Sequence, residues 1–278
     1  MREIALLYSG GTDSTCAAVL MSKEYDRVHL LTFKRFGLFC MDNIKYNIPR
    51  LKDSCGKDKF LHKVIDINKL FEEVSYNRYL HYLKKYNFMV LSTCGLCKLS
   101  MHVRALIYCV ENNVKYVCDG SNKYSGNGYF PAQMPSVINE LKKMYSLFDI
   151  EYLTPVLEFN EPPDIGWFDR LGIKENSLIP SEQNNGPAGE TTGSLLHKMN
   201  FFPENNVKGT KLDHKMQARC FQLILFNIFL YGYYLPLHGE KPYLRTTHLF
   251  FKDKIDDAID LINSYFNDSN FSSNIIKH

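Results

Sequence analysis

The chain has 278 residues, of which 45% are hydrophobic and 23% are charged, a composition that excludes disorder as its main state. The glycines follow no triplet period and no heptad repeat is sustained, which excludes a collagen-like or coiled-coil rod. The net charge of +3, from 33 basic and 30 acidic residues, is small for a nucleic-acid-binding domain.

The longest apolar run, 221–235, is interrupted by polar residues and falls short of the roughly 20 residues that a membrane helix needs. The amino-terminal segment is too short, and has the wrong flank, for a signal peptide. We therefore expect a soluble, cytoplasmic protein with no membrane partner. The eight cysteines are irregularly spaced, which disfavours a disulfide framework and favours metal-binding or catalytic thiols.

Up to residue 158 the chain alternates short apolar runs with segments of helical length. Strands are expected at 4–8, 27–33, 60–67, 116–119 and 151–157. Helices are expected at 14–23, 42–53, 69–86, 96–112 and 131–148. Strands separated by helices pair in parallel, so this pattern predicts an α/β fold with a doubly wound, five-stranded parallel sheet.

After residue 158 the pattern changes. A long polar loop is expected at 180–193, a helix at 213–234 with Asp213 as its N-cap, and a final amphipathic helix at 253–266, with a frayed end over the last ten residues. We place a domain boundary here, between residues 1–158 and a mostly helical region, 159–278. The first part carries a charge of +5 (21 − 16) and the second −2 (12 − 14), so a phosphate-rich ligand should favour the first.

The hexapeptide at 9–14 follows the first strand and opens the first helix. Two glycines allow a tight turn and a close backbone approach, and the free N–H groups of a helix start bind anions. A carboxylate fits such a cradle as a helix cap or as a holder of Mg²⁺. The candidate phosphate-binding residues are Ser9, Gly10, Gly11, Thr12, Asp13 and Ser14.

This hexapeptide resembles the SGGxDS signature of the PP-loop ATP pyrophosphatases at every fixed position. The resemblance implies ATP and Mg²⁺ as ligands, cleavage between the α- and β-phosphates, and the strand order 3-2-1-4-5 of the adenine nucleotide alpha hydrolase-like fold. It also implies that the end of the second strand, Thr32, Phe33 and Lys34, contacts adenine. Lys34 and Arg35 are equally well explained as a solvated basic pair.

Cys94 and Cys97 form a C-x-x-C pair where a helix begins, and the helix dipole together with Lys98 would favour the thiolate. Such a pair serves zinc, an iron–sulfur cluster or sulfur transfer. A metal needs further ligands, and Cys220 is the preferred third one. The other candidates for that third position are Cys40, Cys55, Cys118 and His214.

The segment 94–122 resembles the corresponding part of sulfur-inserting members of this superfamily, the tRNA 2-thiocytidine and 2-thiouridine synthetases. Its turn after the fourth strand resembles that of the sulfurtransferase that makes the nickel-pincer cofactor of lactate racemase. With the strand order of the superfamily, this turn would face the hexapeptide across one crevice. The residues of the turn are Asp119, Gly120, Ser121 and Asn122, candidates for contacts with the nucleotide, a metal or the acceptor.

Taken together, the resemblance implies an ATP-dependent sulfurtransferase that adenylates a carbonyl or carboxylate oxygen, releases pyrophosphate, inserts sulfur and releases AMP. Cys94, Cys97 and Asp13 would be the catalytic residues, with a [4Fe-4S] cluster or Zn²⁺ held by Cys94, Cys97 and Cys220. The acceptor is a tRNA base or a small molecule. A sulfur-donor protein and a second copy of the chain are candidate partners.

Two other functions stay open at this level. One is an ammonia-dependent ligase resembling 7-cyano-7-deazaguanine synthase, in which the cysteines would hold a structural zinc ion. The other is a nucleotide-binding subunit without turnover.

Overall fold

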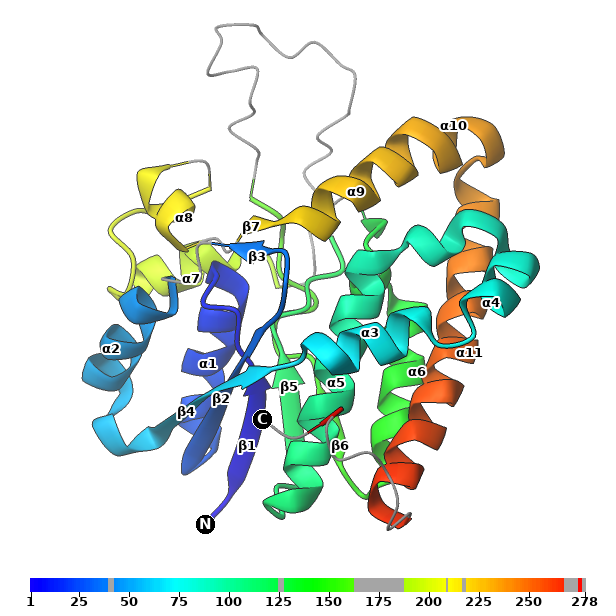
Figure 1. Ribbon diagram of the computed structural model, residues 1–278. Coiled ribbons are helices and arrows are strands. Elements are labelled where there is room, and N and C mark those ends of the chain that lie inside the picture. The colour runs from blue at the N-terminus through cyan, green and yellow to red at the C-terminus, as the bar shows by residue number, and fades with distance from the viewer. Residues whose placement is uncertain are drawn as a thin grey trace, which may run out of the picture.

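The computed structural model describes residues 1–39, 43–124, 128–162, 188–208, 210–216, 219–267 and 275–276. A five-stranded, all-parallel sheet forms its centre, with the order β4-β2-β1-β5-β6 (Figure 1). This order confirms the predicted α/β fold and the predicted 3-2-1-4-5 arrangement. The strands are β1 (Glu3–Leu7), β2 (Arg27–Lys34), β4 (Phe60–Asp66), β5 (Tyr116–Asp119) and β6 (Glu151–Leu153).

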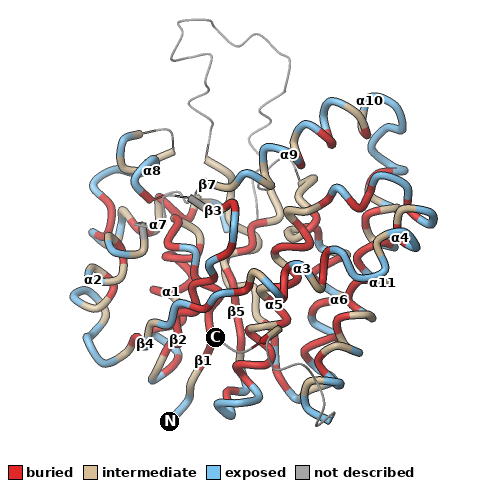
Figure 2. Tube along the Cα trace, in the orientation of Figure 1, coloured by how far each residue is buried: buried red, intermediate tan, exposed pale blue. Residues whose placement is uncertain are grey.

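Helices cover both faces of the sheet, because successive side chains of a strand point to opposite sides. Most of β1 is buried (Figure 2). Its Ile4 and Leu6 enter one cluster of buried residues, and its Ala5 and Leu7 enter the other. The first cluster is covered by α1 (Thr12–Glu24) and α2 (Asn43–Cys55), and the second by α3 (Asn68–Tyr76), α5 (Thr93–Glu111) and α6 (Pro135–Ser146).

The register brings the carboxyl ends of the central strands together. Leu7, the last residue of β1, pairs with Leu31 of β2 and with Asp119, the last residue of β5. The loops that follow β1 and β5 therefore leave the sheet side by side, at the upper edge in Figure 1. Ligands of open parallel sheets bind at this edge.

Two predicted helices are divided in the structure. The helix expected at 69–86 is α3 followed by α4 (Tyr79–Tyr86), and Arg78 between them has a left-handed φ of 55°. The helix expected at 131–148 is a short 3-10 turn, η4 (Pro131–Gln133), followed by α6, because a proline at position 135 keeps the preceding residue out of the helix. Two further 3-10 turns are η1 (Lys57–Lys59) and η2 (Asn87–Leu91).

The prediction of a single helix at 213–234 is wrong. The chain forms α8 (Lys211–Met216), the short strand β7 (Arg219–Cys220), α9 (Phe221–Phe229) and the π-helical turn η6 (Leu230–Tyr234). β7 pairs antiparallel with β3 (Leu38–Phe39), a contact that the sequence did not predict. The extended backbone at β7 arises from this pairing and not from a local helix breaker.

The remaining helices are α7 (Thr192–Lys198), α10 (Leu235–His238) and α11 (Glu240–Asn267), which begins 13 residues earlier than expected. Leu196 of α7 and Met216 of α8 pack into the cluster under α1, whereas Phe226 of α9 and Phe250 of α11 pack into the cluster under α5. Residues beyond 158 therefore complete the core on both faces of the sheet, and a division into two domains stays a prediction.

α9 buries one face and exposes another. Phe226 and Phe229 are buried, whereas Ile224 and Ile228 are exposed at 57% and 64%. A homodimer through the exposed face stays a prediction.

Among the described residues, no single helix is long and apolar enough to cross a bilayer; Tyr79–Leu91 and Thr93–Glu111 pass that test only together, as a pair bent by 104°.

Parts of the sequence predictions fall outside the described residues. These are Cys40, most of the polar loop at 180–193, and most of the last ten residues. Ile276, one of the described residues near the carboxyl end, is buried against the α5 cluster at 3% exposure, so that position is not frayed.

Candidate functional site

A cavity of about 280 Å³ lies at the carboxyl edge of the sheet. Its walls come from the loop after β1, the end of β2, the loop after β5 and the second turn of α5. Eight residues singled out from the sequence line it: Ser9, Gly11, Thr12, Asp13, Ser14, Thr32, Phe33 and Gly120. Six further lining residues were not predicted as lining residues: Leu7, Tyr8, Leu38, Lys98, Met101 and Gln133.

The loop 9–14 is held in a tight turn by its own side chains. Gly10 has a left-handed φ of 78°, which favours glycine. The Ser9 hydroxyl oxygen lies 3.1 Å from that of Ser14 and accepts the Gly11 N–H at 3.3 Å. Within the described part of the chain, no side chain caps the start of α1. The first-turn N–H groups and the positive end of the helix dipole are therefore available to an anion in the cavity.

The loop after β5 touches the start of α1 directly. A Cβ built on Gly120 would lie 2.6 Å from the Ser14 nitrogen and 2.8 Å from its Cα. Backbone atoms cannot move away cheaply, so only glycine permits this approach. The contact joins the two loops that the superfamily resemblance places on opposite sides of one crevice.

Asp13 is the acidic group that lines the cavity. Its Oδ1 accepts a hydrogen bond of 2.5 Å from the Thr192 hydroxyl at the start of α7. Burial raises the pKa of Asp13 to about 6, and the Thr192 bond only partly offsets that cost. A carboxylate held in a site that disfavours its charge is suited to bind a cation. Thr192 lies 179 residues further along the chain, and no feature of the sequence singled it out.

Asp119 does not line the cavity but anchors Lys98, which does. The fully buried Asp119 carboxylate lies 2.6 Å from the Lys98 Nζ and accepts hydrogen bonds from the Ser121 N–H and hydroxyl. Although burial alone would raise it, the pKa of Asp119 is held well below its usual range, mainly by the Lys98 charge and by His102. Burial lowers the pKa of His102 itself, so this imidazole is neutral at pH 7.

The other predicted residues of the nucleotide site have supporting positions. The Asn122 amide donates to the Phe159 carbonyl at 3.0 Å, and its Oδ1 accepts the Tyr124 N–H. The Gly10 carbonyl accepts a bond from the Asn47 amide. Lys34 is exposed and does not line the cavity. Asn122, Gly10 and Lys34 are thus not among the residues that line the cavity.

Gln133 is a polar group that the sequence did not suggest. Its Oε1 is buried and has no hydrogen-bond partner in the described part of the chain, although the residue lines the cavity. A buried acceptor without a partner costs free energy that a ligand donor would recover. An amino or hydroxyl group of a nucleotide has the required chemistry.

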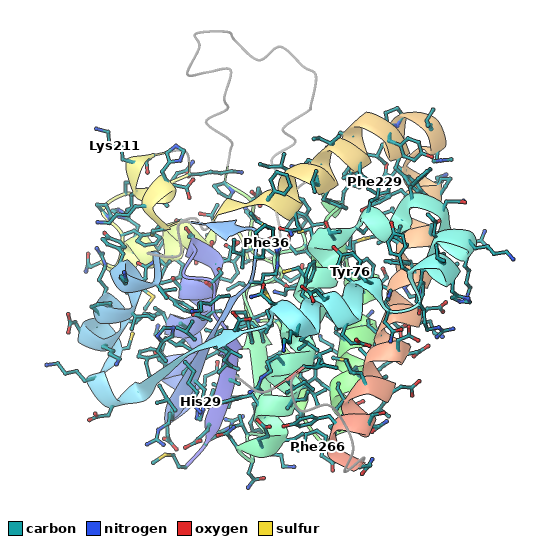
Figure 3. All side chains as sticks on the ribbon, viewed as in Figure 1. His29, Phe36, Tyr76, Lys211, Phe229 and Phe266 are labelled. Atoms are coloured by element: carbon teal, nitrogen blue, oxygen red, sulfur yellow. The ribbon has the colours of Figure 1, made fainter. Side chains whose placement is uncertain are left out.

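The thiols gather around Arg35. Its Nε donates to the Cys97 sulfur at 2.6 Å, and its Nη2 donates to the Cys220 sulfur at 3.2 Å. Arg35 is only 5% exposed, so its interpretation as part of a solvated basic pair is wrong. The next residue, Phe36, labelled in Figure 3, is 86% exposed. The charged Arg35 is thus buried and the apolar Phe36 is exposed, the reverse of the usual preference of these side chains.

The protonation of the thiols also differs from expectation. Burial raises the pKa of Cys94 to about 12, and it raises that of Cys97 despite the opposing charge of Arg35. The expectation that Lys98 and the helix dipole favour a thiolate is wrong for the free protein, because burial outweighs them and Lys98 is paired with Asp119. Both thiols are therefore neutral at pH 7.

The arrangement fits thiols around a guanidinium better than a metal centre. Among the described residues, no group of three or more His, Cys, Asp or Glu side chains is placed to hold a metal ion. The Arg35 guanidinium, itself a cation, contacts both Cys97 and Cys220. A metal held by Cys94, Cys97 and Cys220 stays a prediction.

No protein-family model matches the chain, and no curated protein matches it. Among solved structures, a match is described as a predicted subunit of a tRNA methyltransferase from Methanocaldococcus jannaschii. It is 21% identical, covers 80% of this chain and 97% of its own, and has a TM-score of 0.36. A likeness at this level carries no argument about function.

Replacing Gly120 by Ala should disturb both the fold and the site. The added Cβ would meet the backbone of Ser14, so we expect a loss of about 1–3 kcal/mol in unfolding free energy and weaker nucleotide binding. Urea denaturation and calorimetry with ATP measure the two effects. Gly232→Ala, where a Cβ meets nothing within 4 Å, is the matched control. Equal stability of the two variants would contradict the close approach.

Asp13→Asn should stabilise the free protein, because it removes a carboxylate whose charge is disfavoured by burial. Because burial raises the pKa of Asp13 from 3.8 to about 6, ionisation of Asp13 destabilises the fold, by on the order of 3 kcal/mol. The gap in unfolding free energy between variant and wild type should open as pH rises from about 4 to about 6. Denaturation across this range tests it. A gap of the same size at every pH would exclude Asp13 titration as its cause.

Lys98→Met should destabilise the protein strongly, by about 3–5 kcal/mol, because it leaves the Asp119 carboxylate buried without its cation. Adding Asp119→Asn should recover part of that loss, since the buried charge is then removed. A double-mutant cycle by chemical denaturation measures the coupling. Strict additivity of the two substitutions would show that the pair is not coupled.

Proposed function

We propose that this chain is an ATP-dependent sulfurtransferase of the PP-loop type, which adenylates an oxygen of its acceptor and then replaces that oxygen with sulfur. One observation carries the proposal: the first turns of α5 join the two parts of the site. Cys97 contacts Arg35, and Lys98, the next residue, lines the cavity formed by the loop 9–14.

The cavity supports the first step. The acceptor oxygen attacks the α-phosphorus of ATP, the bond from that phosphorus to the bridging oxygen breaks, and pyrophosphate leaves. The N–H groups of the loop 9–14 would stabilise the charge on the leaving phosphates, and the Lys98 ammonium, which lines the cavity while paired with Asp119, would add to them. Asp13 is the residue that would hold Mg²⁺, which when bound neutralises phosphate charge.

Phe33 and Gln133 would position the nucleoside. The Phe33 ring lines the cavity at the end of β2, and the Gln133 acceptor is available to a donor on the ligand. Gly120 leaves the backbone of the loop after β5 close to the start of α1, where the α-phosphate would lie. Phe33 and Gln133 would thus contact the nucleoside, and the loop after β5 the α-phosphate, with groups that are in place before the nucleotide binds.

The thiols support the second step. A sulfur donor, supplied by a separate protein, would leave a persulfide on Cys97. Its terminal sulfur attacks the adenylated carbon, and AMP leaves. The Cys220 thiol, held by the same guanidinium, then attacks the Cys97 sulfur, so that the product keeps the transferred sulfur and a Cys97–Cys220 disulfide forms. An external dithiol must reduce this disulfide before the next cycle.

Arg35 would stabilise the negative sulfur in this step. In the free protein it donates to neutral thiols, and its charge becomes more valuable when either sulfur loses its proton. It acts through Cys97 and Cys220, which makes it a positioning residue. Sulfur transfer should therefore depend on Arg35 more steeply than adenylation does.

The test separates the two steps. Pyrophosphate release from ATP is measured with unfractionated tRNA as acceptor, and sulfur incorporation is followed with ³⁵S from a persulfide donor. We expect Cys97→Ser to retain pyrophosphate release and to lose sulfur incorporation by about 100-fold or more. Cys55→Ser, which alters a cysteine at the end of α2, is the control.

Two results would overturn the proposal. Wild-type protein that releases no pyrophosphate with any acceptor would favour a nucleotide-binding subunit. Full sulfur incorporation by Cys97→Ser would remove the thiol from the mechanism.

A further inference from the structure

A second hollow, of about 910 Å³, lies between α4 and η2 on one side and η6, α10 and the start of α11 on the other. These helices meet at the right of Figure 1, past the end of α9 that lies away from β7. None of its lining residues lines the cavity at the carboxyl edge of the sheet. We name this hollow the helical cleft.

The helical cleft is basic. Lys85, Lys241, Arg245 and His238 line it, and no Asp or Glu is among its lining residues. Lys85 pairs with Asp253 at 2.5 Å, whereas Lys241 and Arg245 are exposed and form no ion pair with any described residue. Residues 79–91 carry +2, with no acidic side chain, and 230–253, which include the Asp253 partner of Lys85, carry +1 (3 − 2). The cleft therefore presents cations although residues 159–278 as a whole are acidic.

Aromatic rings line the same cleft, namely those of Tyr86, Phe88, Tyr233 and Tyr234. Phe88, 48% exposed, packs edge-on against Tyr233 at 5.4 Å. Tyr233 in turn stacks on Phe229, labelled in Figure 3, at 6.1 Å and an interplanar angle of 28°. Tyr234 lies 4.8 Å from the His238 ring. Each ring packs against another aromatic ring, which restricts its orientation before a ligand arrives.

We propose that the helical cleft binds a single-stranded segment of the RNA acceptor. Bases stack on exposed aromatic rings whatever their sequence, and lysine and arginine neutralise the phosphates between them. An acidic peptide would use the cations but would leave the exposed surface of the Phe88 ring without a ligand. This inference rests on the proposed function in one respect, the existence of an acceptor, and it specifies RNA as the class of that acceptor.

The path of the chain connects the cleft to the thiols. α9 and η6 run from Cys220, beside Arg35, to Tyr233 in the cleft. Thirteen residues of helix span about 20 Å, the length of a few nucleotides. Phe88 lies six residues before Cys94 on the other wall. A strand seated in the cleft can thus present a neighbouring base to the thiols.

Fluorescence anisotropy with a labelled 12-nucleotide single-stranded RNA tests the proposal. The double variant Lys241→Glu/Arg245→Glu should bind at least 10-fold more weakly, and the slope of log affinity against log salt should become shallower by about 1.4, since each single-strand phosphate contact contributes about 0.7. Phe88→Ala should weaken binding about 5- to 100-fold with the slope unchanged.

Lys142→Glu/Lys143→Glu, which makes the same charge change on exposed positions of α6, is the matched control and should retain most of the affinity. Circular dichroism confirms that each variant folds. Equal losses in the α6 control and in the cleft variant would overturn the proposal, as would displacement of the RNA by a poly-glutamate peptide at equal charge concentration.

Pyrophosphate release by the cleft variants with a saturating acceptor separates this inference from the proposed function. Retained RNA binding in a chain without pyrophosphate release would refute the function alone. Retained pyrophosphate release with unchanged RNA affinity in the cleft variants would refute the cleft alone.

Discussion

The candidate site depends on one backbone contact, the approach of Gly120 to the first turn of α1. The parallel register of β1 and β5 brings the two loops to the same edge of the sheet, and the missing side chain of Gly120 lets them touch. On one side of this contact lie the N–H groups of the helix start, and on the other the buried Asp119 that holds Lys98. The positive groups of the cavity are therefore fixed by the same few residues that close it.

The site combines groups that the protein would not keep for stability alone. Burial disfavours the charge of Asp13, the Gln133 oxygen lacks a partner among the described residues, and the guanidinium of Arg35 is withdrawn from water. Each of these arrangements costs free energy in the free protein. A cation would relieve the cost at Asp13, a hydrogen-bond donor that at Gln133, and a negative sulfur that at Arg35. Such costs commonly mark binding and catalytic sites.

The region after residue 158 takes part in the site as well as in the core. It supplies Thr192 to Asp13 and Cys220 to Arg35, and it forms one wall of the helical cleft. α9 and η6 connect the last two, with Cys220 at the start of α9 and the cleft residues Tyr233 and Tyr234 at the end of η6. In the described part of residues 159–278, Thr192 and Cys220 thus contact residues of the candidate site that is built on the parallel sheet.

The order of the strands followed from the resemblance to the PP-loop enzymes. Local patterns in the sequence were sufficient for the five strands and for the turns at 9–14 and 119–122, because strand periodicity, glycine turns and helix starts depend on neighbouring residues. They were not sufficient for the helix at 213–234, where pairing of β7 with β3 overrides helical propensity. Arg35, Thr192, Gln133 and the helical cleft likewise depend on residues that are distant in the chain. Only the packing of α7, α9 and α11 onto the sheet decides which of these side chains meet and which are withdrawn from water.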